Sequence, residues 1–152
     1  NTGVSREEAR QFIETYFQRY PKVKEYMDRM VKEAKRTGYV TTILGRRRPI
    51  PEINSRNNVA RKAAERTAIN TPIQGSAADI IKLAMVRIHQ RFKEEKLSSK
   101  MVLQVHDELI FEIPPQEEEI VRKIVTEEME GAIELKVPLV VKIDVGKSWD
   151  EV

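Results

Sequence analysis

The chain has 152 residues, of which 40% are hydrophobic and 34% are charged, and its formal net charge is +3. This composition is typical of a folded globular domain and excludes a largely disordered chain. The absence of cysteine excludes disulfides, zinc–thiolate sites and thiol catalysis. No apolar run reaches the roughly 20 residues that a membrane-spanning helix needs, so no membrane partner is expected.

Charge is divided unevenly along the chain. Residues 1–66 carry 16 Lys and Arg against 8 Asp and Glu, whereas residues 67–152 carry 11 against 16. A basic half suggests a polyanionic partner on that side of the molecule. The alternative is that helix surfaces exposed to water happen to differ in charge, and this would explain the uneven distribution equally well.

Two amphipathic helices are predicted at the start of the chain. Ser5 and Glu8 have the spacing of a capping box, and Pro21 suits the first turn of a second helix that ends at Gly38. The first helix has apolar residues at helical spacing, namely Ala9, Phe12, Ile13, Tyr16, Phe17 and Tyr20. We expect this stripe, and a similar one over residues 23–34, to be ordinary hydrophobic core.

Three consecutive arginines lie at a predicted turn. Residues 39–43 favour a short strand, and Gly45 begins a turn that leads into an extended return. Arg46, Arg47 and Arg48 suit phosphate oxygens, because a guanidinium donates several hydrogen bonds in a fixed plane. Runs of basic residues are more often simply solvated, and that alternative stays open.

Two further helices are predicted in the middle of the chain. The first covers residues 57–69, and Pro72 is expected to open the second, because proline lacks the N–H that a helix interior needs. Arg66, Asn70 and Gln74 are spaced by four, so one continuous helix would place them on the same face. Their side chains suit the acceptors that every base pair presents in the minor groove. The ordinary alternative is polar residues on a helix surface.

The pattern then changes to the alternation of β-strands. Residues 101–105 and 109–113 are apolar runs separated by His106, Asp107 and Glu108, which predicts a β-hairpin with charge at its tip. Adjacent carboxylates on a rigid tip would suit Mg²⁺, which prefers oxygen ligands. One carboxylate cannot organise a two-metal site alone, and no partner for Asp107 is evident in the chain. A solvent-exposed turn is the ordinary alternative.

A helix and a strand are predicted to follow the hairpin. Residues 116–131 favour a helix with an acidic first turn, and alternation over residues 139–145 predicts a strand with one buried face. The last four elements are then strand, strand, helix and strand. We predict an α+β fold in which an antiparallel sheet packs against several long helices.

Three segments together resemble DNA polymerase family A, the bacterial DNA polymerase I type. The hairpin tip, Val-His-Asp-Glu at residues 105–108, resembles the carboxylate motif of that family's palm. Residues 65–79, with the sequence ERTAINTPIQGSAAD, look like its long helix beside the primer–template. Residues 44–48 are similar to its Gly-Arg-Arg-Arg turn. The order and spacing of all three match, which makes the set far more specific than each motif alone.

This resemblance implies a function and a role for each matched residue. The enzyme would be a DNA-directed DNA polymerase, a nucleotidyltransferase of DNA replication and repair that uses two Mg²⁺ ions. Asp107 would bind catalytic Mg²⁺, Glu108 would support that site, and His106 would lie near the primer terminus. The middle helix would contact the newest base pair from the minor groove, and the basic turn would face the DNA backbone. The implied DNA-binding residues are Arg66, Asn70, Gln74, Arg46, Arg47 and Arg48.

The resemblance also implies that the chain is the carboxyl-terminal part of a polymerase domain. Residues 1–56 would be a helical pair and Arg-rich turn next to the fingers, and residues 57–152 a portion of the palm. Partners would be primer–template DNA, deoxynucleoside triphosphates and the remaining segments, namely the first palm strand, fingers and thumb. The setting would be a bacterial cytoplasm, with the chromosome.

The resemblance further implies that the other metal-binding aspartate would belong to an earlier palm strand, which is not among these residues. We therefore expect no polymerase activity from these 152 residues alone. The alternative function is a non-catalytic nucleic-acid-binding module. Such a module would bind DNA in a salt-sensitive manner and would need neither Asp107 nor a divalent metal.

Overall fold

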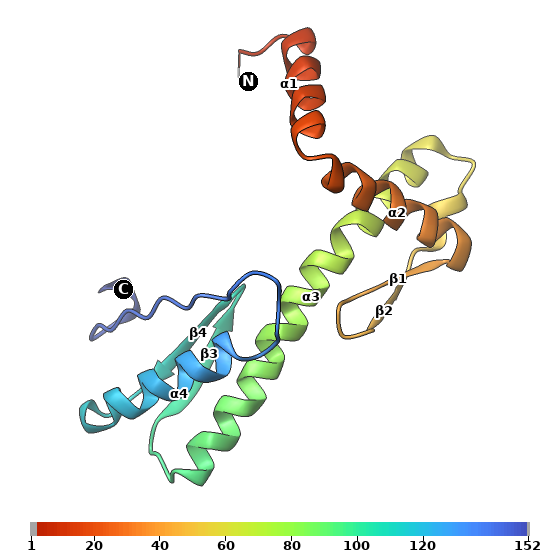
Figure 1. Ribbon diagram of the computed structural model, residues 1–152. Coiled ribbons are helices and arrows are strands. Elements are labelled where there is room, and N and C mark those ends of the chain that lie inside the picture. Colours follow the sequence, from red (N-terminus) through yellow and green to blue (C-terminus); the bar gives the residue numbers. More distant parts are fainter. Residues whose placement is uncertain (1–2, 152) are drawn as a thin grey trace. The chain divides into compact units, whose positions relative to one another are not determined.

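The structure is a computed structural model that describes residues 3–151 (Figure 1). The chain divides into two compact units, with the boundary between Ser76 and Ala77. Each unit contains its own cluster of buried hydrophobic residues.

The first unit begins with two helices whose ends follow the sequence pattern. α1 spans Arg6–Arg19, and its capping box is formed: the Ser5 hydroxyl accepts from the Glu8 N–H at 3.2 Å, and the Glu8 carboxylate accepts from the Ser5 N–H at 2.8 Å. α2 spans Pro21–Thr37 and ends at Gly38, whose φ of 82° lies in the left-handed region that glycine tolerates. Both helix predictions are confirmed.

The apolar stripe of α1 is not part of the core in this chain. No residue of α1 is buried, and Phe12 is 75% exposed. The prediction of ordinary core is wrong for α1, because nothing within residues 3–151 covers most of this face. The same prediction is correct for α2, where Met30 and Ala34 are buried.

A two-stranded antiparallel sheet follows α2 and contacts it. β1 (Tyr39–Thr41) pairs with β2 (Arg47–Pro49), with Val40 opposite Arg48, which confirms the predicted strand, turn and return. The 3₁₀ turn Pro51–Asn54 then leads to the next helix. The first hydrophobic cluster joins α2, this sheet and the start of that helix, and it consists of Ala34, Val40, Ile50, Ile53, Ala64 and Ala68.

The helix that follows, α3, spans Asn58–Glu94 and contains Pro72 in its interior. The predicted break at Pro72 is therefore wrong. An interior proline removes one helical hydrogen bond and costs about 3 kcal/mol or more. The helix is buried on either side of the proline, at Ala68 and at Ala84, and this packing offsets the cost. The Ser76 hydroxyl also bonds to the Pro72 carbonyl.

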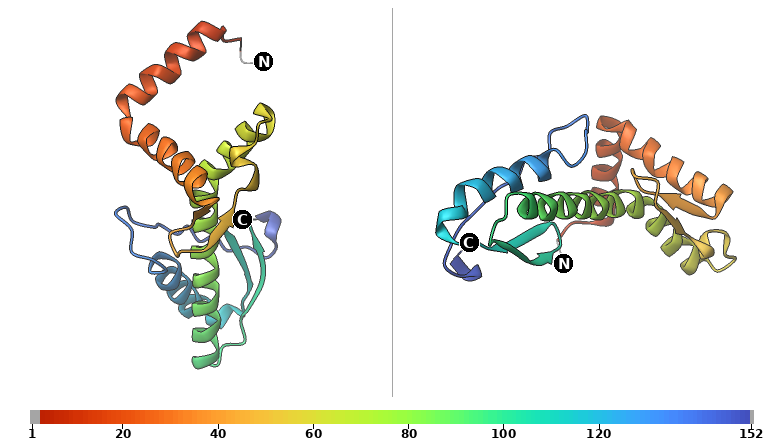
Figure 2. Two further views of the ribbon diagram at one scale, coloured as in Figure 1. Left: turned by 90° about the vertical axis from the view of Figure 1, so that its right-hand side faces the viewer. Right: turned by 90° about the horizontal axis from the view of Figure 1, so that it is seen from below.

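The second unit contains residues 77–94 of α3, a β-hairpin and one further helix. β3 (Lys100–Val105) pairs with β4 (Glu108–Glu112), with a bulge between Met101 and Leu103. α4 (Glu118–Glu130) follows the 3₁₀ turn Pro115–Glu117. Hairpin and α4 lie beside the second half of α3 in Figures 1 and 2. The buried residues of this second cluster are Ala84, Ile88, Phe92, Val121, Ile124, Val125 and Ala132.

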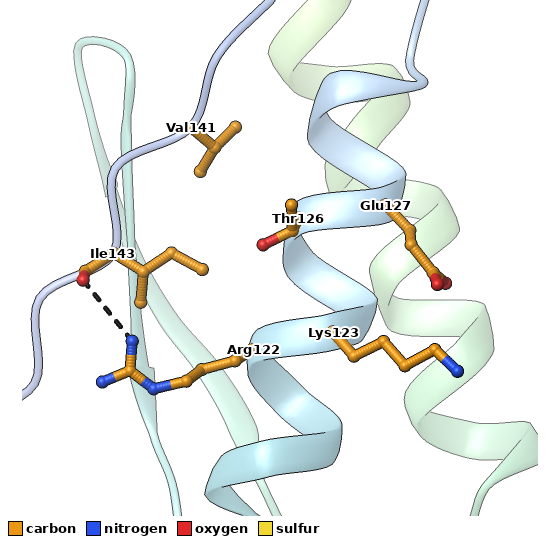
Figure 3. A pocket seen from close by; sticks show the side chains of 6 residues that line it. All are labelled: Arg122, Lys123, Thr126, Glu127, Val141 and Ile143. Carbon is orange, nitrogen blue, oxygen red and sulfur yellow. Dashed lines mark hydrogen bonds between the residues drawn. The ribbon is translucent and has the colours of Figure 1, made fainter.

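Residues 139–145 form no strand, so that prediction is wrong. An extended segment counts as a strand only when its backbone pairs with a neighbour, and this segment has no ladder among residues 3–151. It runs beside α4 instead (Figure 3). Glu130 accepts from the Val141 N–H at 3.0 Å, and Arg122 donates to the Ile143 carbonyl at 3.5 Å. The rest of the predicted α+β fold, with antiparallel strands packed on helices, is confirmed.

In the part of the chain that the structure describes, none of the helices combines the length and apolar character that crossing a lipid bilayer requires.

Glu117 fastens the loop before β3 to the start of α4. Its carboxylate accepts from the Ser99 hydroxyl at 2.5 Å and from the backbone N–H groups of Ser98 and Ser99 at 2.9 Å each. These bonds, above all that from the Ser99 hydroxyl, favour the ionised form and hold the pKa of Glu117 below its ordinary value of 4.5.

We predict that Glu117→Gln lowers the melting temperature of the chain by a few degrees at pH 7. A carboxyl group with a lowered pKa stabilises the fold above its unfolded pKa, and this contribution disappears as the pH falls through its folded pKa. The difference from the unchanged chain should therefore vanish under strongly acidic conditions. Thermal unfolding followed by circular dichroism measures it. Glu119→Gln, an exposed neighbour on α4, is the control, and equal losses for both variants at pH 7 would contradict the prediction.

Candidate functional site

The tip of the β3–β4 hairpin presents the candidate metal ligands to solvent. Val105 pairs with Glu108, so His106 and Asp107 form a two-residue turn. The side chains of His106, Asp107 and Glu108 are all exposed. The base of the hairpin is held because Phe111 and its apolar neighbours pack against the second hydrophobic cluster. A carboxylate at this tip is therefore accessible to solvent, while the hairpin that carries it is held by hydrophobic packing at its base.

His106 has an unfavourable backbone conformation. Its φ is 53°, in the left-handed region, where a residue with a Cβ costs roughly 1–2 kcal/mol. Glycine or asparagine is the usual occupant of such a turn position. The Gln104 side-chain amide donates to the His106 carbonyl at 2.5 Å and so supports the turn. A strained residue that is not glycine is often retained for what its side chain does.

Asp107 and Glu108 have the donor chemistry that suits Mg²⁺. Carboxylate oxygens are preferred ligands of this ion, which usually keeps several waters and binds substrate phosphates as well. Among residues 3–151, no three His, Asp or Glu side chains gather closely enough to hold a metal. The hairpin therefore fits one part of a metal site, and the other ligands would be water, phosphate or side chains beyond this range.

Three hydrogen-bonding side chains form a row on α3. Arg66, Asn70 and Gln74 are all exposed, and α3 continues through Pro72. Each step of four residues turns the helix by about 40° beyond a full circle and advances it by about 6 Å. The three side chains therefore share one face of the helix, which the predicted break would have prevented.

The arginines of the β1–β2 turn divide between the two faces of the hairpin. Arg48 lies opposite Val40, so the two side chains leave the hairpin on the same face, and Arg46 belongs to that face by alternation; Val40 is buried there, whereas both arginines stay exposed. Arg46 Nη2 donates to the carbonyl of Gly75 on α3 at 3.1 Å. Arg47 lies on the other face, with its guanidinium 4.8 Å from the centre of the Tyr39 ring.

The turn and α3 together enclose a pocket of about 190 Å³ in the first unit. All three arginines line it together with Gln74. The full lining is Thr42, Arg46, Arg47, Arg48, Pro49, Thr71, Gln74 and Gly75. Arginine and glutamine side chains carry many hydrogen-bond donors, so residues of this kind around the basic pocket suit phosphate oxygens and the acceptors of bases. Arg66 and Asn70 lie nearer the start of α3 and do not line it.

The predicted site residues thus form two groups. His106, Asp107 and Glu108 lie in the second unit, and the six predicted DNA-binding residues lie in the first. Sequence reasoning did not place Thr42, Pro49, Thr71 or Gly75 in the basic pocket. One signal pointed to Gly75: a glycine inside a helix usually has a packing reason, because it lowers helix stability.

Comparisons with known proteins agree on one family. The family model described as DNA polymerase family A matches residues 1–151. The DNA polymerase I of Caldicellulosiruptor bescii is 55% identical over 148 residues, which are 97% of this chain and 17% of that protein. The DNA polymerase I of Bacillus subtilis is 55% identical over 149 residues, which are 98% and 17% of the two chains.

A solved structure gives the same result. It is described as the POL domain of Pol1 from M. smegmatis in complex with DNA primer-template and dNTP. The similarity has a TM-score of 0.94 at 48% sequence identity and covers 97% of this chain and 26% of that one. The present chain therefore spans about 17% of the length of the curated relatives it matches.

We predict that His106→Gly raises the free energy of unfolding of the hairpin unit by about 1 kcal/mol, because glycine adopts the left-handed conformation without strain. His106→Asn should be nearly neutral, and the β-branched His106→Val should be destabilising. Urea unfolding of the full chain measures all three. If His106→Gly were no more stable than His106→Val, backbone strain at this turn would be contradicted.

Proposed function

Because this chain belongs to DNA polymerase family A, we propose that it is part of a DNA-directed DNA polymerase that binds the primer terminus and one side of the catalytic metal site. The observation that carries the proposal is the similarity over 97% of the chain to a polymerase domain solved with DNA primer-template and dNTP. The substrates would be primer–template DNA and deoxynucleoside triphosphates, and the setting a bacterial cytoplasm.

In the full-length relatives, segments outside the matched region would supply the remaining parts of the polymerase. The first palm strand with its metal-binding aspartate, the fingers and the thumb would come from those segments. Residues 1–56 would lie next to the fingers, and residues 57–152 would form part of the palm. The exposed apolar face of α1 supports this proposal, because such a face needs a covering element.

The hairpin tip would hold a divalent ion at the reacting atoms. Asp107 would be a direct ligand of Mg²⁺, Glu108 would support the site beside it, and His106 would lie near the primer terminus. When bound, Mg²⁺ would lower the pKa of the primer 3′-hydroxyl and neutralise charge on the triphosphate. The exposure of Asp107 on a supported turn is what such a role requires.

The first unit would hold the duplex. Arg66, Asn70 and Gln74 would donate to minor-groove acceptors, which lie at similar places in every correct base pair. Arg46, Arg47 and Arg48 would face backbone phosphates around the basic pocket. These contacts place the primer end, and positioning supplies much of the rate enhancement in phosphoryl transfer. A distorted terminal pair would misplace the acceptors and slow extension.

We predict that Asp107→Ala lowers primer extension by about a thousandfold or more, because it removes a ligand that neutralises charge in the transition state. DNA affinity should stay almost unchanged, since the basic pocket is intact. A direct measurement uses a chimera in which this chain replaces the matching segment of the Bacillus subtilis DNA polymerase I.

In that chimera, Glu112→Gln is the control, because it removes a carboxylate from the other end of the same hairpin. Normal extension by Asp107→Ala would contradict the metal role. If the unchanged chimera bound DNA in a salt-sensitive manner but showed no extension that depends on metal or Asp107, the alternative of a non-catalytic DNA-binding module would be favoured.

We predict that Arg66→Ala or Gln74→Ala lowers extension from a matched primer terminus by about tenfold, the equivalent of one lost hydrogen bond, and changes the discrimination against a mismatched one. Single-turnover extension on matched and mismatched primers measures both quantities. Gln90→Ala is the matched control, because Gln90 is an exposed glutamine of the same helix outside the row. Equal kinetics for Gln74→Ala and Gln90→Ala would contradict minor-groove contact.

A further inference from the structure

The β1–β2 turn approaches α3 so closely that no side chain fits between them. Thr42, next to β1, is 6% exposed and faces Gly75 on the helix. A Cβ added to Gly75 would lie 2.7 Å from Thr42 Cγ2, well inside the ordinary contact distance of 3.4–4 Å. Glycine inside a helix costs about 0.5–1 kcal/mol relative to alanine. This close contact explains why glycine is needed here.

Hydrogen bonds fasten the turn around this contact. The Arg46 N–H donates to the Thr42 hydroxyl at 3.1 Å, and the Arg46 guanidinium donates to the Gly75 carbonyl at 3.1 Å. The Ile43 N–H donates to the hydroxyl of Ser76 at 2.9 Å. Two of these bonds, together with the Thr42–Gly75 contact, therefore join the turn to a single turn of α3, and the third holds the turn itself in shape.

That same turn of the helix carries Gln74. The basic pocket has the arginine turn as one wall and α3 as the other, and both Thr42 and Gly75 line it. The closeness of Thr42 to Gly75 therefore sets how far the arginine groups stand from the Gln74 amide. Duplex DNA has a fixed spacing between phosphates and base edges, so contacts to both require a fixed spacing in the protein.

We propose that Thr42 and Gly75 are positioning residues, which hold the arginine turn in register with the minor-groove row of α3. The phosphate contacts and the contacts to the terminal base pair then act on the same nucleotides. This inference rests on the proposed function and adds to it two residues that touch no reacting atom. In this proposal Gly75 acts indirectly, by setting the spacing between the arginine turn and Gln74 across the pocket.

The test is Gly75→Ala in the chimeric polymerase. The added methyl group must push Thr42 away from α3 and widen the pocket. We expect the specificity constant for the DNA primer to fall between about tenfold and a hundredfold, with a smaller change in turnover at saturating DNA and weaker rejection of mismatches. Unchanged kinetics for Gly75→Ala would overturn the proposal.

A second substitution tests the geometry directly. Thr42→Ser removes Cγ2 and keeps the hydroxyl that accepts from the Arg46 N–H. The double variant Gly75→Ala with Thr42→Ser should recover most of the loss, whereas Gly75→Ala with Thr42→Val, which keeps a methyl group and loses the hydroxyl, should not. Failure of the serine variant to rescue would overturn the proposal.

Ser76→Ala provides an independent check should Gly75→Ala fail to fold. It removes the acceptor of the Ile43 N–H without any steric clash, and we expect a smaller loss in the same parameters. No change in mismatch rejection would count against the proposal. The outcomes distinguish the proposed function from the positioning role. If the chimera without any substitution shows no extension that depends on Asp107, the proposed function is refuted. If that chimera is active and Gly75→Ala leaves its kinetics unchanged, only the positioning role is refuted.

Discussion

The continuity of α3 through Pro72 is the constraint on which the arrangement of the candidate site depends. A continuous helix places Arg66, Asn70 and Gln74 on one face, and it also supplies the surface that the arginine turn contacts. A break at Pro72 would separate the first members of the row from the last. The packing of small residues before and after the proline thus supports the proposed function as well as stability.

Local signals predicted the local structure well. The capping box at Ser5, the helix end at Gly38 and the β3–β4 hairpin involve only neighbouring residues, so the sequence alone indicates them. The turn of the hairpin is one residue shorter than predicted, because Glu108 belongs to β4. The wrong predictions all depend on contacts with residues distant in the sequence. Proline disfavours a helix locally, but distant packing decides at Pro72. Residues 139–145 alternate like a strand, yet nothing in the described chain pairs with them. Most of the stripe of α1 is likewise left uncovered by residues 3–151.

The candidate site divides in the same way. The order of three motifs indicated nine residues, and the structure shows that they are exposed and that four of them share one basic pocket. The contact between Thr42 and Gly75 joins residues from two distant segments, so no periodicity or spacing could predict it. What the sequence did contain was a glycine in a helix otherwise rich in good helix formers, an anomaly that only tertiary structure explains.

The uncovered face of α1 also has a practical consequence. Phe12, Ile13, Tyr16 and Tyr20 present aromatic and aliphatic surface to water, with exposed fractions from 44% to 75%. A patch of this kind favours self-association, because burying it between copies removes apolar area from water. A sample of the 152-residue chain will therefore behave best when dilute, and aromatic-to-polar exchanges on α1 offer a route to crystals or spectra of this chain.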